Sequence, residues 1–136
     1  ELIEWIIKTE LLEPIKPLLN AGMIFEAIVL MLNNISANSV FYKKALKLEG
    51  AVTFNQIAMK CVYEMFMNII SEKSTGKKSK YRWLTPEVIS TYYAQSLCFI
   101  TEGWIAQGMD DIEPKEMAEA YMYLITRSMD DILSEL

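Results

Sequence analysis

The sequence predicts an all-α fold, a single domain of about six helices spanning residues 1–136, and three observations carry that prediction. Apolar residues recur at the three- and four-residue spacing of helices over most of the chain. Prolines and glycines fall between these periodic segments, where they end helices or form turns. The chain contains no alternating strand pattern, no internal repeat and no low-complexity tract. A length of 136 residues suits one domain.

The first predicted helix covers Glu1 to Leu12, and Pro14 and Pro17 are expected to end it because proline breaks the backbone hydrogen-bond ladder. The second helix covers Met23 to Ser36 and contains one charged residue, Glu26. So apolar a helix is expected to be enclosed by its neighbours.

A short third helix is predicted from Val40 to Glu49. Asn38 or Ser39 can supply the side-chain oxygen that caps its N-terminus. Gly50 suits the left-handed residue that commonly follows a helix.

Thr53 is the expected cap of the fourth helix, which carries two apolar stripes and must therefore be buried on two sides. One stripe contains Phe54, Ile57, Cys61, Met65 and Ile69, and the other contains Met59, Tyr63, Phe66 and Ile70. The next segment, Ser74 to Tyr81, has no apolar period and is predicted to be an exposed loop.

Thr85 and Pro86 have the residue types that cap and open a helix, and the twenty-two residues from Val88 to Met109 contain one charge, Glu102. Large aromatic side chains occur on every side of this fifth helix, so it has no face suited to water. A domain of this size has few places to enclose a helix completely. A partner chain or a bound ligand is expected to cover the remainder.

The sixth helix is predicted to begin at Pro114 and to continue to about Glu135, with Arg127 paired to Asp130 or Asp131 on its wet face. Its apolar face contains Ala118, Tyr121, Ile125, Met129, Ile132 and Leu136. The connection to the fifth helix is short, which predicts an antiparallel hairpin.

Composition excludes several classes of function. A net charge of −5 argues against nucleic-acid binding by this segment. The chain has no histidine, which removes the commonest general base and transition-metal ligand, so no catalytic residue, cofactor or metal site is predicted. Cys61 and Cys98 lie in apolar helical patterns as expected of buried thiols in a reducing cytoplasm. The longest apolar run, Ala27 to Leu32, is too short to span a membrane.

The remaining charged clusters are interpreted as solvated. Neighbouring residues of a helix point in different directions, so Asp110 and Asp111 do not naturally share a proton or a metal, and the same holds for the later Asp pair. The basic run Lys77, Lys78, Lys80 and Arg82 can contact phosphate, but an exposed loop is the preferred interpretation.

Methionines and aromatics on the fourth and fifth helices suit a pocket for a small hydrophobic or amphipathic molecule, and they equally suit a filled core. A lone carboxylate on an apolar helix is costly to bury without a partner. Glu102 is therefore expected at an exposed rim, opposite a cation of a partner chain, or facing a cationic ligand.

Two strings carry a resemblance to a known family. These are FYKKALKLEG (Phe41 to Gly50) and YRWLTPEVISTYYAQSLCFITEGWIAQGMDDIEPKEMAE (Tyr81 to Glu119). They resemble the C-terminal domain of TetR-family transcriptional regulators, in particular the type frequent in Firmicutes, and the resemblance covers roughly Glu1 to Met129. The chain departs from the family at two positions. Glu113 stands where a better helix cap is usual. Gly103 stands where a second tryptophan often precedes Trp104, and the absence of that tryptophan is expected to open space beside Trp104.

The resemblance implies a homodimer whose last two helices pair with their twins as a four-helix bundle, and an effector pocket in each domain. It also implies that DNA is bound only through a separate N-terminal helix-turn-helix domain, which is not recognisable in this chain. The predicted partner face contains Tyr92, Gln95, Phe99, Glu102, Ile125, Met129 and Ile132. The predicted pocket contains Met59, Tyr63, Phe66, Tyr93, Leu97 and Trp104.

The leading hypothesis is thus the ligand-sensing and dimerisation domain of a TetR-like repressor, cytoplasmic and without enzymatic activity. The alternative is a helical protein–protein interaction module with the same dimer, a filled core and no small-molecule site. An enzyme is disfavoured because no catalytic constellation occurs in the sequence.

Overall fold

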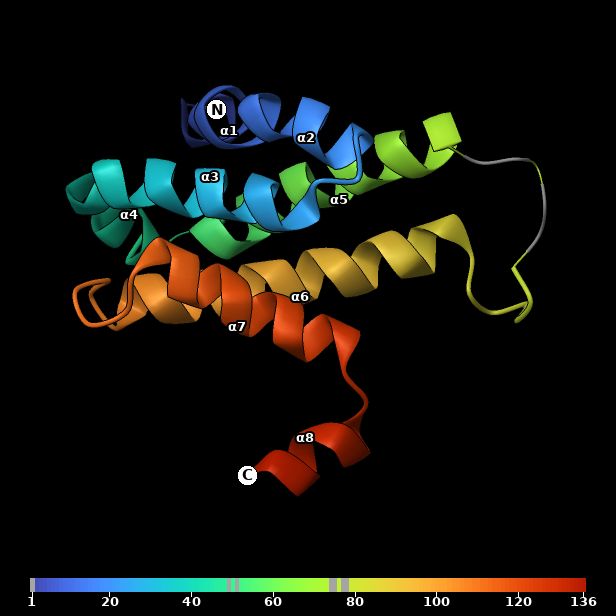
Figure 1. Cartoon of the computed structure of the whole chain (residues 1–136). Coiled ribbons are helices and arrows are strands. Elements are labelled where there is room, and N and C mark those ends of the chain that lie inside the picture. The colour runs from blue at the N-terminus through green and yellow to red at the C-terminus, as the bar shows by residue number, and fades with distance from the viewer. Residues whose placement is uncertain (1, 49, 51, 74–75, 77–78) are drawn as a thin grey trace.

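The fold is all-α, as the sequence predicts. A computed structural model describes residues 2–48, 50, 52–73, 76 and 79–136, and these contain no strand. In Figure 1 the N-terminal helices lie along the top, the middle layer holds α3, α4 and α5, and α6 and α7 lie beneath. The short helix α8 stands apart at the bottom of that view.

The N-terminal segment stays helical through both prolines, so the prediction that Pro14 and Pro17 end it is wrong. Helix α1 (Leu2–Ile6) continues into a π-helix, η1 (Ile7–Leu12), a 3₁₀ turn, η2 (Glu13–Ile15), and α2 (Lys16–Asn20). Each proline falls at the start of a new helical segment, where its missing N–H removes no internal hydrogen bond. The helix type changes at these points, from π to 3₁₀ and then to α, and Ile7, Leu11, Leu12 and Ile15 remain buried in the core.

Helix α3 (Ile24–Ala37) supplies the centre of the middle layer, with Ala27, Ile28, Met31, Leu32 and Ile35 buried. Helix α4 (Ser39–Leu46) follows after a sharp bend. The expected side-chain cap of this helix is not formed, and the Asn38 amide donates to the carbonyl of Asn34 at 3.5 Å.

Helix α5 (Phe54–Lys73) begins with a capping box. The Thr53 hydroxyl accepts from the Gln56 N–H at 3.2 Å, and the Gln56 side chain accepts from the Thr53 N–H at 2.8 Å. Helix α6 (Pro86–Ala106) begins with the predicted cap, in which the Thr85 hydroxyl accepts from the Val88 N–H at 3.3 Å. Helices α5 and α6 form the largest helix–helix contact of the domain.

The predicted last helix is divided in two. Helix α7 (Pro114–Thr126) ends where Arg127 turns extended, and α8 (Met129–Glu135) begins after Ser128, whose hydroxyl accepts from the Asp131 N–H at 3.1 Å. The prediction of a continuous helix to Glu135 is therefore wrong, because a serine that can cap a new helix competes with continuation. Arg127 pairs with Glu135 at 3.4 Å and not with either aspartate.

The turn between α6 and α7 reverses the chain as predicted, with Gly108 at φ +98° and Met109 at φ +65°. Helix α7 then packs more extensively on α3 than on α6. Much of the outer side of α6 is consequently left without a cover from the same chain.

Candidate functional site

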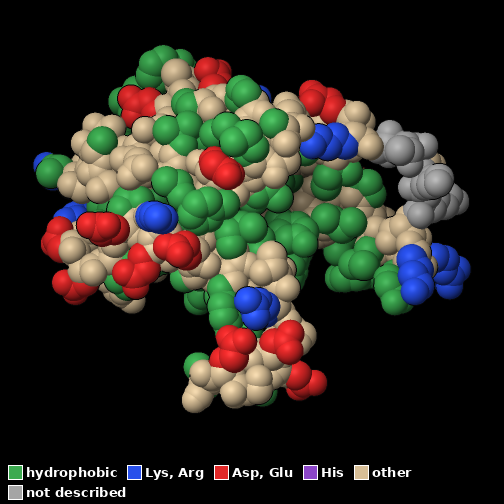
Figure 2. Space-filling view, in the orientation of Figure 1, with side chains coloured by type: hydrophobic (Ala, Val, Ile, Leu, Met, Phe, Trp, Pro, Cys, Tyr) green, Lys and Arg blue, Asp and Glu red, His purple; other side chains and the backbone are tan. Residues whose placement is uncertain are grey.

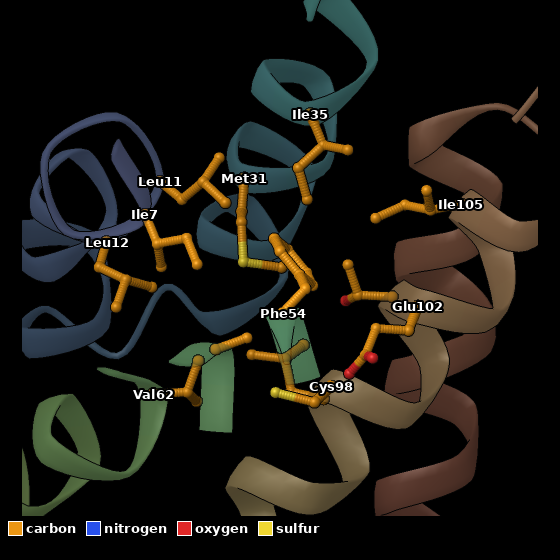
Figure 3. A pocket seen from close by; sticks show the side chains of 13 residues that line it. Ile7, Leu11, Leu12, Met31, Ile35, Phe54, Val62, Cys98, Glu102 and Ile105 are labelled. Carbon is orange, nitrogen blue, oxygen red and sulfur yellow. The ribbon is translucent and has the colours of Figure 1, made fainter. Parts of the chain in front are cut away.

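A cavity of about 40 Å³ lies at the centre of the domain, where the N-terminal segment meets α3, α5 and α6. Figure 3 shows Ile7, Leu11 and Leu12 on one side and side chains of α6 on the other, with Phe54 between them. The walls are formed by Ile7, Leu11, Leu12, Met31, Ile35, Phe54, Ala58, Val62, Leu97, Cys98, Thr101, Glu102 and Ile105.

Two polar side chains interrupt the apolar wall, and both come from α6. The Glu102 carboxylate accepts a hydrogen bond from the Asn55 amide at 2.6 Å, at the start of α5. Partial burial raises the pKa of Glu102 above its ordinary value, and the Asn55 hydrogen bond opposes that rise. The Thr101 hydroxyl oxygen is buried and has no hydrogen-bond partner in the described part of the chain. The cavity therefore has one polar edge in an otherwise apolar lining.

The π-helix forms the wall opposite α6. π-Helices are rare and are often found at functional sites. Lys8 binds Glu4 at 3.3 Å and Glu64 of α5 at 3.4 Å, while Lys60 of α5 binds Glu4 at 3.1 Å. These exposed ion pairs link the N-terminal segment to α5 at the surface and contribute little stability.

The two cysteines are buried free thiols, as the sequence predicts. Burial, with a smaller contribution from the nearby Glu102, raises the pKa of Cys98 to about 12, and burial likewise raises the pKa of Cys61. Neither thiol has the thiolate character that a nucleophile requires. The described residues contain no group of three or more acidic, cysteine or histidine side chains positioned for a metal ion.

The six predicted pocket residues are spread over several environments. Leu97 lines the central cavity. Phe66 and Tyr93 lie together, with ring centroids 6.2 Å apart, and Met59 and Tyr63 are half-buried on the same helix as Phe66. Trp104 is buried away from the cavity, where its indole N–H donates to the Ile112 carbonyl at 2.8 Å. Gly103 faces open space, so a missing tryptophan there leaves the surface bare instead of enlarging a pocket.

A second concavity is an open groove of about 690 Å³ along the first half of α6. Figure 2 shows hydrophobic side chains around a hollow that opens between the C-terminal helix at the bottom and basic side chains at the lower right. The groove is lined by Trp83, Leu84, Glu87, Val88, Ile89, Thr91, Tyr92, Tyr93 and Gln95.

Most residues predicted for the partner face are exposed. Phe99 is 77% exposed, Met129 74% and Tyr92 64%, and Gln95 is also exposed. Ile125 and Ile132 are half-buried. Glu102 departs from this set, because its carboxylate lines the central cavity.

The contribution of the N-terminal segment to the cavity was missed from the sequence. Ile7 and Leu11 have the helical spacing of a core stripe, but that spacing does not reveal which helices meet across a shared space. Four further exposed small or apolar residues on α6 and α7 are not among the residues predicted for the partner face: Gly103, Ala106, Ala120 and Leu124.

No described helix is by itself long and apolar enough to cross a membrane, whereas α3 and α4, bent by 89° at their junction, reach the required length and composition only as a pair.

Comparison with known proteins gives one informative result. The sequence matches a family described as transcriptional regulator C-terminal region over residues 23–127, which is more than half of the chain. No curated protein and no solved structure matched the sequence. The match begins just before α3 and ends at the break between α7 and α8. The chain therefore belongs to the C-terminal domains of TetR-family transcriptional regulators.

Proposed function

We propose that this chain is the homodimeric effector-sensing domain of a TetR-like repressor acting in the cytoplasm, and that it controls DNA binding by an N-terminal domain joined to it. The observation that carries the proposal is the position of the cavity. Its walls come from the N-terminal segment on one side and from α6, the helix with the large uncovered face, on the other. A ligand bound in the cavity would contact the N-terminal segment and α6 at the same time.

The size of the cavity supports a mechanism in which the domain expands to admit the effector. Pockets for small molecules are usually about 300–1,000 Å³, whereas this cavity of about 40 Å³ accommodates little more than a water molecule. An effector must therefore move the walls apart to enter. Because a ligand shifts an equilibrium only by binding one state better, the expanded arrangement is the state that effector favours.

The lining supports an effector that is mostly apolar. Apolar side chains surround most of the space and select an apolar body. The Glu102 carboxylate retains acceptor capacity beyond its bond to Asn55, and no described Lys or Arg lies within ion-pair distance of it. The effector is accordingly apolar or amphipathic, with any polar group directed to this edge.

The homodimer is supported by the uncovered side of α6. Tyr92, Phe99, Gly103 and Ala106 follow one another at helical spacing, and all four are exposed. Exposed aromatic and small residues gathered on one helix face are typical of an interaction site. The small residues Gly103 and Ala106 allow close approach of a second helix at one end, and the aromatic residues supply buried area at the other.

A thermal-unfolding screen tests effector binding. The probes are decylamine, decanoate and decanol, which share one tail and differ in head-group charge. The two ionic probes are kept below their micelle concentrations and decanol below its solubility limit. A specific ligand at about 100 times its dissociation constant stabilises the folded state by about 2.7 kcal/mol. The substitution Ala58→Leu fills the cavity wall and is expected to abolish the stabilisation. The matched control Ala37→Leu makes the same change at an exposed position of α3 and is expected to retain it.

The alternative function, an interaction module with a filled core, is favoured by the small size of the cavity. It predicts that no probe raises the unfolding temperature and that Ala58→Leu and wild type respond identically. Stabilisation that survives Ala58→Leu would place the bound probe elsewhere and would contradict the proposed site.

A further inference from the structure

The short helix α8 carries an apolar stripe that its own chain does not cover. Met129, Ile132, Leu133 and Leu136 have the spacing of one helical face. Met129 is 74% exposed, Leu133 60% and Leu136 93%, while Ile132 is half-buried. A separate amphipathic helix of seven residues is not stable in water without packing, so this stripe needs a partner surface.

Contacts at the end of α7 hold α8, which we call the C-terminal arm, in place. Tyr123 donates a hydrogen bond to Glu135, and Arg127 pairs with the same carboxylate at 3.4 Å. These contacts fix α8 beside the end of α7 while its apolar stripe remains exposed. Figure 1 shows the arm standing away from the body.

The groove along α6 is long enough to receive α8. Its α6 wall runs from Glu87 to Gln95, roughly 12 Å at 1.5 Å per residue, and α8 from Met129 to Glu135 is roughly 9 Å long. The groove wall is mostly apolar, with Trp83 and Tyr92 both largely exposed. Its volume of about 690 Å³ is sufficient for a row of aliphatic side chains.

Charge is complementary at one end of the groove. Lys80 and Arg82 are exposed in the segment that leads to Trp83, and Asp130 and Asp131 are exposed in the first turn of α8. Pairing them places the N-terminal end of the arm beside Trp83. Because Glu87 also lines the groove, the two aspartates must lie on the side of Lys80 and Arg82.

We propose that the α8 arm of one protomer docks into the α6 groove of its partner, an exchange that rests on the proposed homodimer. Tyr92 and Gln95 belong both to the groove and to the face proposed to pair with a second copy. Pairing of that face therefore brings a second chain to the groove. Within its own chain α8 is held by Tyr123 and Arg127, and no α8 residue lines the groove.

Cysteine cross-linking between chains of different mass tests the exchange. One tagged chain carries Trp83→Cys and an untagged chain carries Met129→Cys, and a second mixture combines Gln95→Cys with Leu133→Cys. All four positions are exposed, so the fold is expected to tolerate them, and the native thiols are buried. Under mild oxidation both mixtures are expected to give the tagged–untagged covalent dimer. Trp5→Cys mixed with Met129→Cys, the control on the far layer, is expected to give none.

The outcomes separate this inference from the proposed function. A chain that sediments as a monomer overturns both the homodimer and the exchange. A dimer in which neither mixture cross-links overturns only the exchange. A chain carrying both Trp83→Cys and Met129→Cys that forms an internal disulfide, with no rise in mass, places the arm in its own groove and also overturns the exchange.

Discussion

Replacement of Phe99 by alanine is expected to weaken the homodimer strongly while leaving the protomer folded. Phe99 projects from α6 with 77% of its surface exposed, so it contributes little to the core of its own chain. In the proposed dimer it is buried against the second chain. Symmetry places the same residue at both sides of the interface, and each substitution therefore removes two side chains.

The magnitude follows from the exposed fraction. Complete burial of a phenylalanine side chain stabilises by about 1.5–3 kcal/mol, and 77% of that is roughly 1.2–2.3 kcal/mol for each protomer. Two copies give about 2.5–4.5 kcal/mol. At about 1.4 kcal/mol for each tenfold change, the dissociation constant of the dimer rises roughly 10²- to 10³-fold.

Sedimentation equilibrium over a concentration series measures this dissociation constant, and circular dichroism checks that the helical content is retained. The matched control is Trp5→Ala, which removes an aromatic side chain that is 60% exposed on α1, in the layer farthest from α6 in Figure 1. It is expected to leave the dissociation constant unchanged. An equal affinity for Phe99→Ala and wild type, or an equal weakening by Trp5→Ala, would refute the proposed face.

Three further predictions concern the fold and the cavity. Because the folded state raises the pKa of Glu102 above 4.5, it binds this proton more tightly than the unfolded chain, and the stabilisation present below pH 4.5 is lost as pH rises through the folded pKa. Urea unfolding from pH 4 to 7 is expected to show a smaller loss of stability for Glu102→Gln than for wild type, and an identical pH dependence would contradict this. Thr53→Ala removes the capping box of α5 and is expected to lower the free energy of unfolding by about 1 kcal/mol; a urea midpoint equal to that of wild type would exclude a stabilising cap. Ser128→Ala removes the cap of α8 and is expected to speed amide hydrogen exchange in residues 129–135 and not in α7, whereas unchanged exchange would show that the cap does not hold the arm.

The helices were largely predictable because their signals are local. Thr53 and Thr85 each have a capping hydroxyl at the right distance in sequence, and both cap as expected. The apolar stripes of α5 follow from spacing alone. The all-α class required nothing beyond these local patterns.

Errors arose where two local preferences compete. Ser128 lies in a stretch with continuous apolar spacing, and only the structure shows that it caps a new helix and separates α8 from α7. Pro14 and Pro17 normally end helices, but each falls at the first turn of a new segment. The change of helix type is not evident from apolar spacing, because the buried residues Ile7, Leu11, Leu12 and Ile15 lie three or four residues apart, as they would in an α-helix.

The lining of the cavity could not be predicted from the sequence, because it is assembled by tertiary contacts. Leu97, one of the predicted pocket residues, lines the cavity, but its neighbours Ile7 and Met31 come from helices far away in the sequence. Trp104 is of a residue type common in pockets, but here its indole N–H donates a hydrogen bond to the carbonyl of Ile112. The Asn55 partner of Glu102 is 47 residues away, a separation that no spacing rule anticipates.

Native mass spectrometry of the intact chain at low micromolar concentration, with and without the decyl probes, tests the sensing homodimer most directly. The account predicts a species of twice the 15.7 kDa chain mass that retains at least one of the probes, and loss of that retained mass in Ala58→Leu. A 15.7 kDa monomer throughout, or a dimer that retains none of the three probes, would contradict it.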